Sequence, residues 1–153
     1  MVNIVLFEPQ IPQNTGNIVR TCAATGAYLH LIEPLGFSTK EKELKRAGLD
    51  YWSHVTIKIY ENFQSFLSSN EPENIVVATK HGNKTHSAIS YEINTYLLFG
   101  NATSGLPEQI RKTYAEKSVR IPMLPNIRCL NLSNAVSILI YEAMRQLNYP
   151  KLS

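Results

Sequence analysis

The sequence predicts an α/β fold in which a mostly parallel sheet is flanked by helices. Short apolar, β-branched runs alternate with helical patterns along almost the whole chain, and this alternation is typical of parallel strands joined by helical crossovers. Proline, glycine and asparagine separate the runs, as expected where strands end and helices are capped. The 153 residues, 44% of them hydrophobic and 18% charged, suit a single domain spanning 1–153 with its own core.

The same patterns place the individual elements. We expect strands at residues 2–7, 28–32, 55–60, 74–79, 95–99 and 119–121, and helices at 15–24, 38–47, 62–69, 106–113 and 133–147. Residues 8–14 are too rich in proline to be helical. We therefore expect Asn14 or Thr15 to cap the first helix and Gly26 to end it.

The last helix should be buried on more than one side. Its apolar surface is wider than a single face requires, and it includes Val136, Ile138, Leu139, Ile140, Tyr141, Ala143, Met144 and Leu147. We interpret this surface as packing against both the sheet and a partner subunit, although one broad core face is the simpler alternative. Ser133 or Asn134 is the expected cap of this helix.

Composition excludes several classes of function. The net charge of +3 permits a polyanionic partner without requiring one. The two cysteines and four histidines lack the spacing of metal ligands, so we expect no metal. No apolar run approaches the roughly 20 residues needed to span a bilayer, and the first residues do not resemble a signal peptide. We therefore expect a cytoplasmic protein without a membrane partner.

Three loops that follow expected strands are rich in small and polar residues. They are residues 14–17, 100–105 and 121–134. Ligands of open parallel sheets bind at the carboxyl ends of the strands, so these loops are candidates for a ligand site. Ordinary strand–loop–helix connections are the alternative. Neither a GxGxxG nor a GxxxxGK[ST] motif is present, which argues against dinucleotide and phosphate-loop sites.

Arg20 stands on the first expected helix, close in sequence to the first of these loops. Its planar guanidinium suits paired hydrogen bonds to a phosphate or a carboxylate. Taken alone, an arginine at such a position is more often a partner in a surface ion pair.

Three separated segments together resemble the motifs of a known family. They read Asn14-x-Gly16-x-x-x-Arg20-Thr21, then Phe99-Gly100-x-x-x-x-Gly105-Leu106-Pro107, then Ile121-Pro122-Met123 through Asn131-Leu132-Ser133-Asn134-Ala135. In this order they resemble the three motifs of the SPOUT superfamily. More narrowly, the chain is similar over essentially its whole length to the small tRNA 2'-O-ribose methyltransferases that modify the wobble nucleotide.

The resemblance implies a fold and a reaction that periodicity alone cannot indicate. It implies a deep trefoil knot near the C-terminus, S-adenosylmethionine as methyl donor with S-adenosylhomocysteine as product, and a homodimer formed through the C-terminal helix. It also implies tRNA as substrate, with cytidine or a modified uridine of a leucine tRNA as the expected target. The sequence does not distinguish between these two bases.

The resemblance also implies roles for particular residues. The implied cofactor site consists of Ala78, Thr79, Gly100, Ile121, Cys129 and Leu130. The implied catalytic residues are Asn14, Arg20 and Asn131, and the implied RNA contacts are Arg46, Arg128 and Tyr141. The family proposal includes proton abstraction by the arginine, but arginine stays protonated, so we favour an electrostatic role for Arg20.

The chain departs from the family pattern at three positions. Ala102 stands where glutamate is usual, Ser104 where a basic residue is common, and Cys129 where serine is usual. The loss of a carboxylate and a cation could weaken substrate placement. The alternative hypothesis is therefore a knotted RNA-binding module with little or no turnover. A thiol enzyme built on Cys129 has little support, because no histidine lies near it in sequence.

Overall fold

The sheet is the centre of the structure, a computed structural model that describes residues 1–40 and 51–153. Within these residues seven strands form one sheet in the order β3-β2-β1-β6-β4-β7-β5, and every neighbouring pair is parallel. The strands are β1 (Asn3–Phe7), β2 (Tyr28–Ile32), β3 (Ile57–Tyr60), β4 (Ile75–Ala78), β5 (Lys84–Thr85), β6 (Tyr96–Phe99) and β7 (Ser118–Arg120). The predicted α/β class with a parallel sheet is confirmed.

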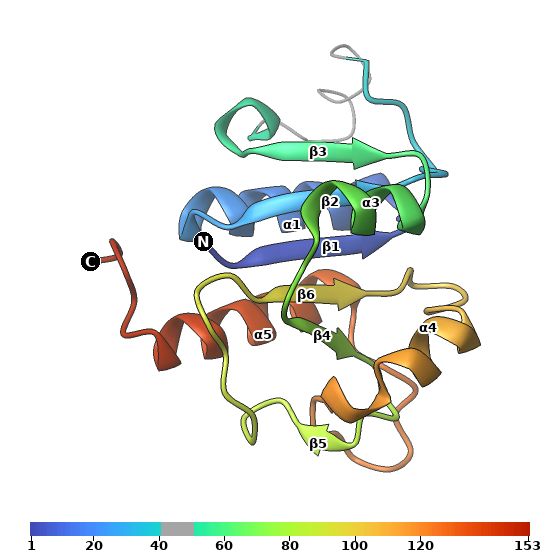
Figure 1. Cartoon of the computed structure of the whole chain (residues 1–153), viewed down its shortest axis with the longest axis vertical. Coiled ribbons are helices and arrows are strands. Elements are labelled where there is room, and N and C mark those ends of the chain that lie inside the picture. Colours follow the sequence, from blue (N-terminus) through green and yellow to red (C-terminus); the bar gives the residue numbers. More distant parts are fainter. Residues whose placement is uncertain (41–50) are drawn as a thin grey trace.

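Helices cover both faces of the sheet (Figure 1). The α-helices of the described residues are α1 (Pro12–Thr25), α3 (Phe63–Asn70), α4 (Glu108–Thr113) and α5 (Leu132–Gln146). In the view of Figure 1, α1 and α5 lie behind the sheet, while α3 and α4 lie in front of it. The helix expected at residues 38–47 falls mostly outside the described residues.

Alternating side chains of the strands build a core on each face. In β1, Ile4 and Leu6 join the cluster that contains residues of α1 and α5, whereas Val5 joins the opposite cluster with Phe66 of α3. This two-sided burial is why the strand is apolar from Ile4 to Phe7 instead of alternating with polar residues. Each such side chain contributes about 1.5–3 kcal/mol relative to an exposed one.

Helix α1 begins earlier than its composition suggested. Pro12 occupies the start of the helix, the N-cap is Ile11, and no side chain caps it. Proline fits the first turn because its fixed φ is helical and its missing N–H would have no partner there. The prediction of Asn14 or Thr15 as cap was therefore wrong. Gly26 ends the helix in the left-handed region at φ 77°, as predicted.

Helix α5 is capped by Asn131, not by Ser133 or Asn134 as predicted. The Asn131 side chain accepts a hydrogen bond from the Ser133 backbone N–H at 2.9 Å. The asparagine is two or three residues closer to the loop than we expected, because Leu132 already belongs to the helix. Strand β5 was also missed, because Lys84 and Thr85 are two polar residues at the sheet edge, too few to show a periodic pattern.

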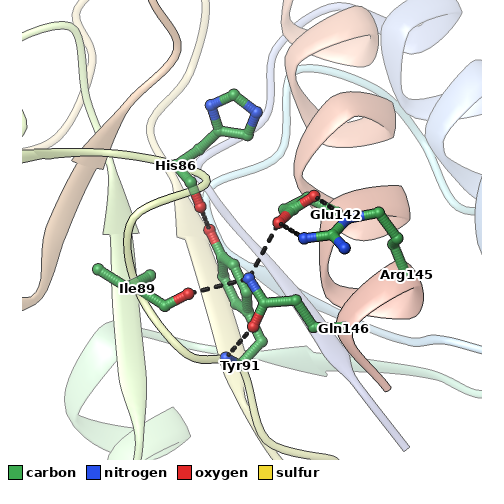
Figure 2. A network of polar contacts seen from close by, with 6 residues as sticks. All are labelled: His86, Ile89, Tyr91, Glu142, Arg145 and Gln146. Carbon is green, nitrogen blue, oxygen red and sulfur yellow. Dashed lines mark hydrogen bonds and ion pairs between the residues drawn. The ribbon is translucent and has the colours of Figure 1, made fainter. Parts of the chain in front are cut away.

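The far end of α5 is fixed to the chain segment that precedes β6 (Figure 2). The Gln146 amide donates to the Ile89 carbonyl at 2.9 Å, and its oxygen accepts from the Tyr91 N–H at 3.0 Å. Arg145 makes two hydrogen bonds to Glu142. Together with the bond from Gln146, they lower the pKa of Glu142 to about 2. Both ends of α5 are thus held by specific polar contacts.

The outer side of α5 remains open in the single chain. Six of its residues are buried, but Ile138 and Tyr141 are 37% and 45% exposed.

In the described part of the chain, no helix combines the length and apolarity needed to cross a membrane. Within those same residues, no three metal-ligating side chains gather closely enough to hold an ion.

A buried histidine, His30 of β2, links strands β1 and β3. The Asn3 amide nitrogen donates to the Met1 carbonyl. The Asn3 side-chain oxygen therefore faces His30 Nε2 at 2.8 Å and accepts a hydrogen bond from it. His30 Nδ1 therefore accepts from the Tyr60 hydroxyl at 2.9 Å. The network requires a neutral imidazole. Burial, and secondarily the positive charge of Lys58, lowers the pKa of His30 to about 4.

This histidine should make the fold sensitive to mild acid. The pKa of His30 is lower in the folded than in the unfolded chain. Its contribution to folding stability is therefore fully present above pH 6.5, the pKa of the unfolded chain, and is lost as the pH falls toward 4. Between pH 7.5 and pH 5 we expect the free energy of unfolding to fall by about 2 kcal/mol through this residue. Urea titrations at both pH values measure it. His30→Gln should flatten the dependence, whereas His54→Gln, at an exposed site, should not.

Candidate functional site

A cavity of about 710 Å³ lies where β4, β6 and β7 end. Its walls come from the loops that follow these three strands, from the start of α1 and from the first turns of α5. Because the strands are parallel, their carboxyl ends lie on one edge of the sheet, and the loops meet there. Segments that are far apart in sequence therefore form one pocket.

Most of the residues singled out from the sequence line this cavity. All six positions of the implied cofactor site do so, namely Ala78, Thr79, Gly100, Ile121, Cys129 and Leu130. Asn14, Arg128 and Asn131 line it as well. The structure thus brings nine of the twelve candidate residues to one place.

The other three candidates lie elsewhere. Arg20 and Tyr141 are exposed on α1 and α5 and are not part of the cavity wall. The guanidinium carbon of Arg20 lies 5.0 Å from the centre of the Tyr51 ring, a cation–π distance that orients the side chain. Arg46 lies outside the described residues.

The loop after β6 is folded tightly at its glycine. A Cβ placed on Gly100 would lie 2.3 Å from the carbonyl carbon of Gly105 and 2.5 Å from the backbone nitrogen of Leu106. Only glycine allows the two ends of the loop to approach this closely. Asn101 closes the turn, because its side-chain oxygen accepts from the Thr103 and Ser104 backbone N–H groups at 3.0 and 2.7 Å. The loop is therefore ordered without the glutamate that is usual at position 102.

Two side-chain contacts connect the cavity walls to one another. The Asn131 amide nitrogen donates to the Asn14 side-chain oxygen at 3.1 Å, which joins the N-terminal ends of α5 and α1. The Thr103 hydroxyl donates to the Gln10 side-chain oxygen at 3.2 Å, which joins the loop after β6 to the loop after β1. These contacts hold the pocket in shape before any ligand binds.

The cavity is electropositive. Among the described residues, its lining includes Lys80, Arg111 and Arg128 and no carboxylate. Sequence reasoning missed Lys80 as a site residue, although it directly follows Thr79 at the end of β4. Arg111 also lines the cavity, and a hydrogen bond from its Nε to the Leu106 carbonyl at 3.3 Å holds it there. A phosphate-bearing ligand suits this lining.

The two thiols have different surroundings. Cys22 is buried, and burial raises its pKa to about 12, so it forms no thiolate near neutral pH. Cys129 is exposed and lines the cavity. It lies between Arg128 and Leu130 and contributes there a small side chain of nearly the size of serine.

The pocket fits a nucleoside-sized cofactor. Its volume lies within the range of roughly 300–1,000 Å³ that is typical of small-molecule sites. Apolar walls come from Ala78, Ile121, Leu130 and Leu139, and they suit a purine ring. Gly100 lines the cavity without a side chain that would cover its backbone groups.

Comparison with known proteins gives a consistent family. The model of the SpoU rRNA Methylase family matches residues 1–141. The tRNA (cytidine(34)-2'-O)-methyltransferase of Escherichia coli K12 is 50% identical over 151 residues, which cover 98% of this chain and 96% of that protein. The enzyme of the same name from Yersinia pestis is 53% identical over 156 residues, with the same coverage of both chains.

Solved structures agree with the sequence comparison. A crystal structure from Bacillus anthracis is 52% identical and superimposes with a TM-score of 0.96 over 100% of this chain and 98% of that one. A structure determined to explain 2-OH methylation of C/U34 on tRNA is 43% identical, with a TM-score of 0.88 and 97% of each chain covered. The SpoU methyltransferase AviRb of Streptomyces viridochromogenes, in complex with AdoMet, has a TM-score of 0.84 at 25% identity, covering 95% of this chain and 57% of that one. The chain therefore belongs to the SpoU methylase family, in agreement with its resemblance to the SPOUT superfamily.

Proposed function

We propose that this protein transfers a methyl group from S-adenosylmethionine to the ribose 2'-hydroxyl of the wobble nucleotide of tRNA. The observation that carries the proposal is the cavity formed by the loops after β4, β6 and β7, which combines apolar walls with the cationic side chains of Lys80, Arg111 and Arg128. Relatives about 50% identical over nearly the whole chain are named for this reaction at cytidine 34. The target is cytidine or a modified uridine, with leucine tRNA as the expected substrate.

The cofactor would be held by the loops at the carboxyl edge of the sheet. Ala78 and Thr79 after β4, Gly100 after β6, and Ile121, Cys129 and Leu130 after β7 would contact it. When bound, S-adenosylmethionine supplies an electrophilic methyl group. Crystal structures of family members contain this cofactor, and the apolar walls and exposed backbone of this cavity suit it.

The protein would accelerate the reaction mainly by positioning the acceptor. Asn14 and Asn131 lie in the cavity wall and would orient the target ribose. Fixing a hydroxyl in line with its reaction partner removes much of the entropic part of the barrier. Arg128 at the cavity, Tyr141 on α5 and Arg46 would contact the RNA around it.

Arg20 would hold an RNA phosphate next to the reacting ribose. It is exposed and oriented by the Tyr51 ring, so a polyanion can reach it. Its guanidinium stays protonated at neutral pH, which favours an electrostatic role over that of a general base. A fixed positive charge also lowers the cost of removing the proton from a nearby hydroxyl.

The proposal includes the assembly and the topology of the family. We propose a homodimer that buries the open side of α5 around Ile138, which is exposed in the single chain, and leaves Tyr141 accessible to the RNA. We also propose one domain spanning 1–153 in the cytoplasm. The trefoil knot near the C-terminus is part of the proposal because the family resemblance implies it. Sedimentation of the purified protein tests the dimer.

Mass spectrometry of tRNA nucleosides tests the reaction. Purified protein is incubated with unmodified leucine tRNA and isotopically labelled S-adenosylmethionine, and the digest is examined for labelled 2'-O-methylcytidine and 2'-O-methyluridine. One labelled methyl group on the wobble nucleotide is the expected result. Tight binding of both RNA and cofactor without any product would instead favour an RNA-binding module, the alternative raised by Ala102 and Ser104.

A further inference from the structure

Three hydrogen-bonded polar side chains connect the first turn of α5 to the cavity wall. Ser133 is 7% exposed and does not line the cavity. Its hydroxyl donates to the Asn131 side-chain oxygen at 2.6 Å. Asn131 in turn donates from its amide nitrogen to the side-chain oxygen of Asn14 at 3.1 Å. Both asparagines line the cavity.

The orientation of the Asn131 amide follows from a backbone donor. A backbone N–H can only donate, and that of Ser133 points at the Asn131 side chain at 2.9 Å. The atom that receives it must be the oxygen, and the Ser133 hydroxyl donates to the same atom. The Asn131 nitrogen is therefore the atom that faces Asn14.

The orientation of Asn14 is then determined as well. Because Asn131 presents a donor, Asn14 must present its oxygen to it, and its –NH₂ group is turned away from Asn131. Among the described residues this nitrogen has no hydrogen-bond acceptor, and it is not sealed from solvent. A side chain that is 9% exposed thus offers two N–H donors at a cavity wall.

We propose that Ser133 is a positioning residue, which acts through Asn131 to present the –NH₂ group of Asn14 to an oxygen atom of the RNA backbone. The inference rests on the proposed function. The cofactor contacts proposed above all come from the loops after β4, β6 and β7, whereas Asn14 belongs to the first turn of α1, the helix that also carries Arg20. Its donors thus belong to the helix that carries the proposed phosphate contact, and not to the loops of the proposed cofactor contacts.

Substitution of Ser133 tests the relay without changing any charge. Ser133→Ala leaves Asn131 with only the backbone donor, so its amide and that of Asn14 are less firmly oriented. We expect kcat to fall about tenfold, with the Kd of S-adenosylhomocysteine unchanged in calorimetry. Ser133→Thr retains the hydroxyl and should restore at least half of the activity. Ser137→Ala is the matched control. Ser137 lies one turn further along the same helix, and its hydroxyl bonds to the Ser133 carbonyl and contacts Thr21 instead of Asn131.

Asn131→Asp separates the cap of the helix from the relay. The aspartate oxygen still accepts from Ser133 and caps α5, so Tm should change little. It cannot donate to Asn14, whose amide should turn and present its oxygen to the cavity. We expect methyl transfer to fall about 100-fold. A kcat for Ser133→Ala within twofold of wild type, no restoration by threonine, or weaker cofactor binding in either variant would overturn the proposal.

A second measurement keeps the relay distinct from the reaction itself. In ¹⁵N spectra, the side-chain –NH₂ resonances of Asn14 should shift when an anticodon stem-loop RNA is added to the wild-type protein, and not when S-adenosylhomocysteine is added. Shifted resonances without methyl transfer would contradict the proposed function and support the relay. Full wild-type activity with unshifted resonances would support the proposed function and contradict the relay.

Discussion

Replacement of Arg20 by alanine should reduce methyl transfer about 100- to 1,000-fold, because a preorganised charge next to the reacting group contributes most in the transition state. Cofactor binding should remain normal, since Arg20 is not part of the cavity wall. The fold should also tolerate the change at this exposed position. Single-turnover rates with labelled S-adenosylmethionine, together with calorimetry of S-adenosylhomocysteine, measure the two effects separately.

Two further variants identify the cause of the loss. Arg20→Lys keeps the charge but loses the planar fork, so an intermediate rate is expected if the guanidinium grips a phosphate. Lys58→Ala changes the net charge by the same amount at an exposed position on β3 and should act like wild type. Unchanged turnover in Arg20→Ala would remove this residue from the mechanism.

Gly100→Ala should abolish most cofactor binding. The added methyl group would lie 2.3 Å from the carbonyl carbon of Gly105, so the two ends of the loop must separate and the cavity wall must move. Overpacking of this kind costs about 1–3 kcal/mol of folding stability. We expect the affinity for S-adenosylhomocysteine to fall at least about 30-fold if a comparable cost reaches the site. Calorimetry and thermal unfolding measure both quantities.

Gly105→Ala is the matched control for the cavity wall. A methyl group there meets no atom within 4 Å, although the φ of +68° is unfavourable for alanine. The left-handed backbone should cost about 1–2 kcal/mol of stability and leave the wall in place. Equal losses of cofactor affinity in the two variants would show that the loop acts through its general stability and not through the contact at Gly100.

Elements with a strong local pattern could be predicted from the sequence. The strand at residues 28–32 and the helix that starts after Asn62 have nearly the predicted bounds. Helix starts were less predictable. Asn131 and Asn134 are equally plausible caps by residue type, and only the path of the incoming chain decides that Asn131 is the cap of α5. The two-residue strand β5 is defined by its pairing with β7 and not by its own residues.

The candidate site, too, was predicted in part from the sequence and decided in part by the tertiary structure. The motif residues from Asn14 to Asn131 could be read from the sequence, and their resemblance to the SPOUT motifs indicated a methyltransferase. Only the tertiary structure decided that Asn14 and Asn131, which are 117 positions apart, share a hydrogen bond, and that Arg20 stands outside the cavity that Asn14 lines. The physical reason is that local preferences fix the strands and helices, whereas the directions of donors and the walls of a pocket arise from contacts between segments that meet only when the sheet is assembled.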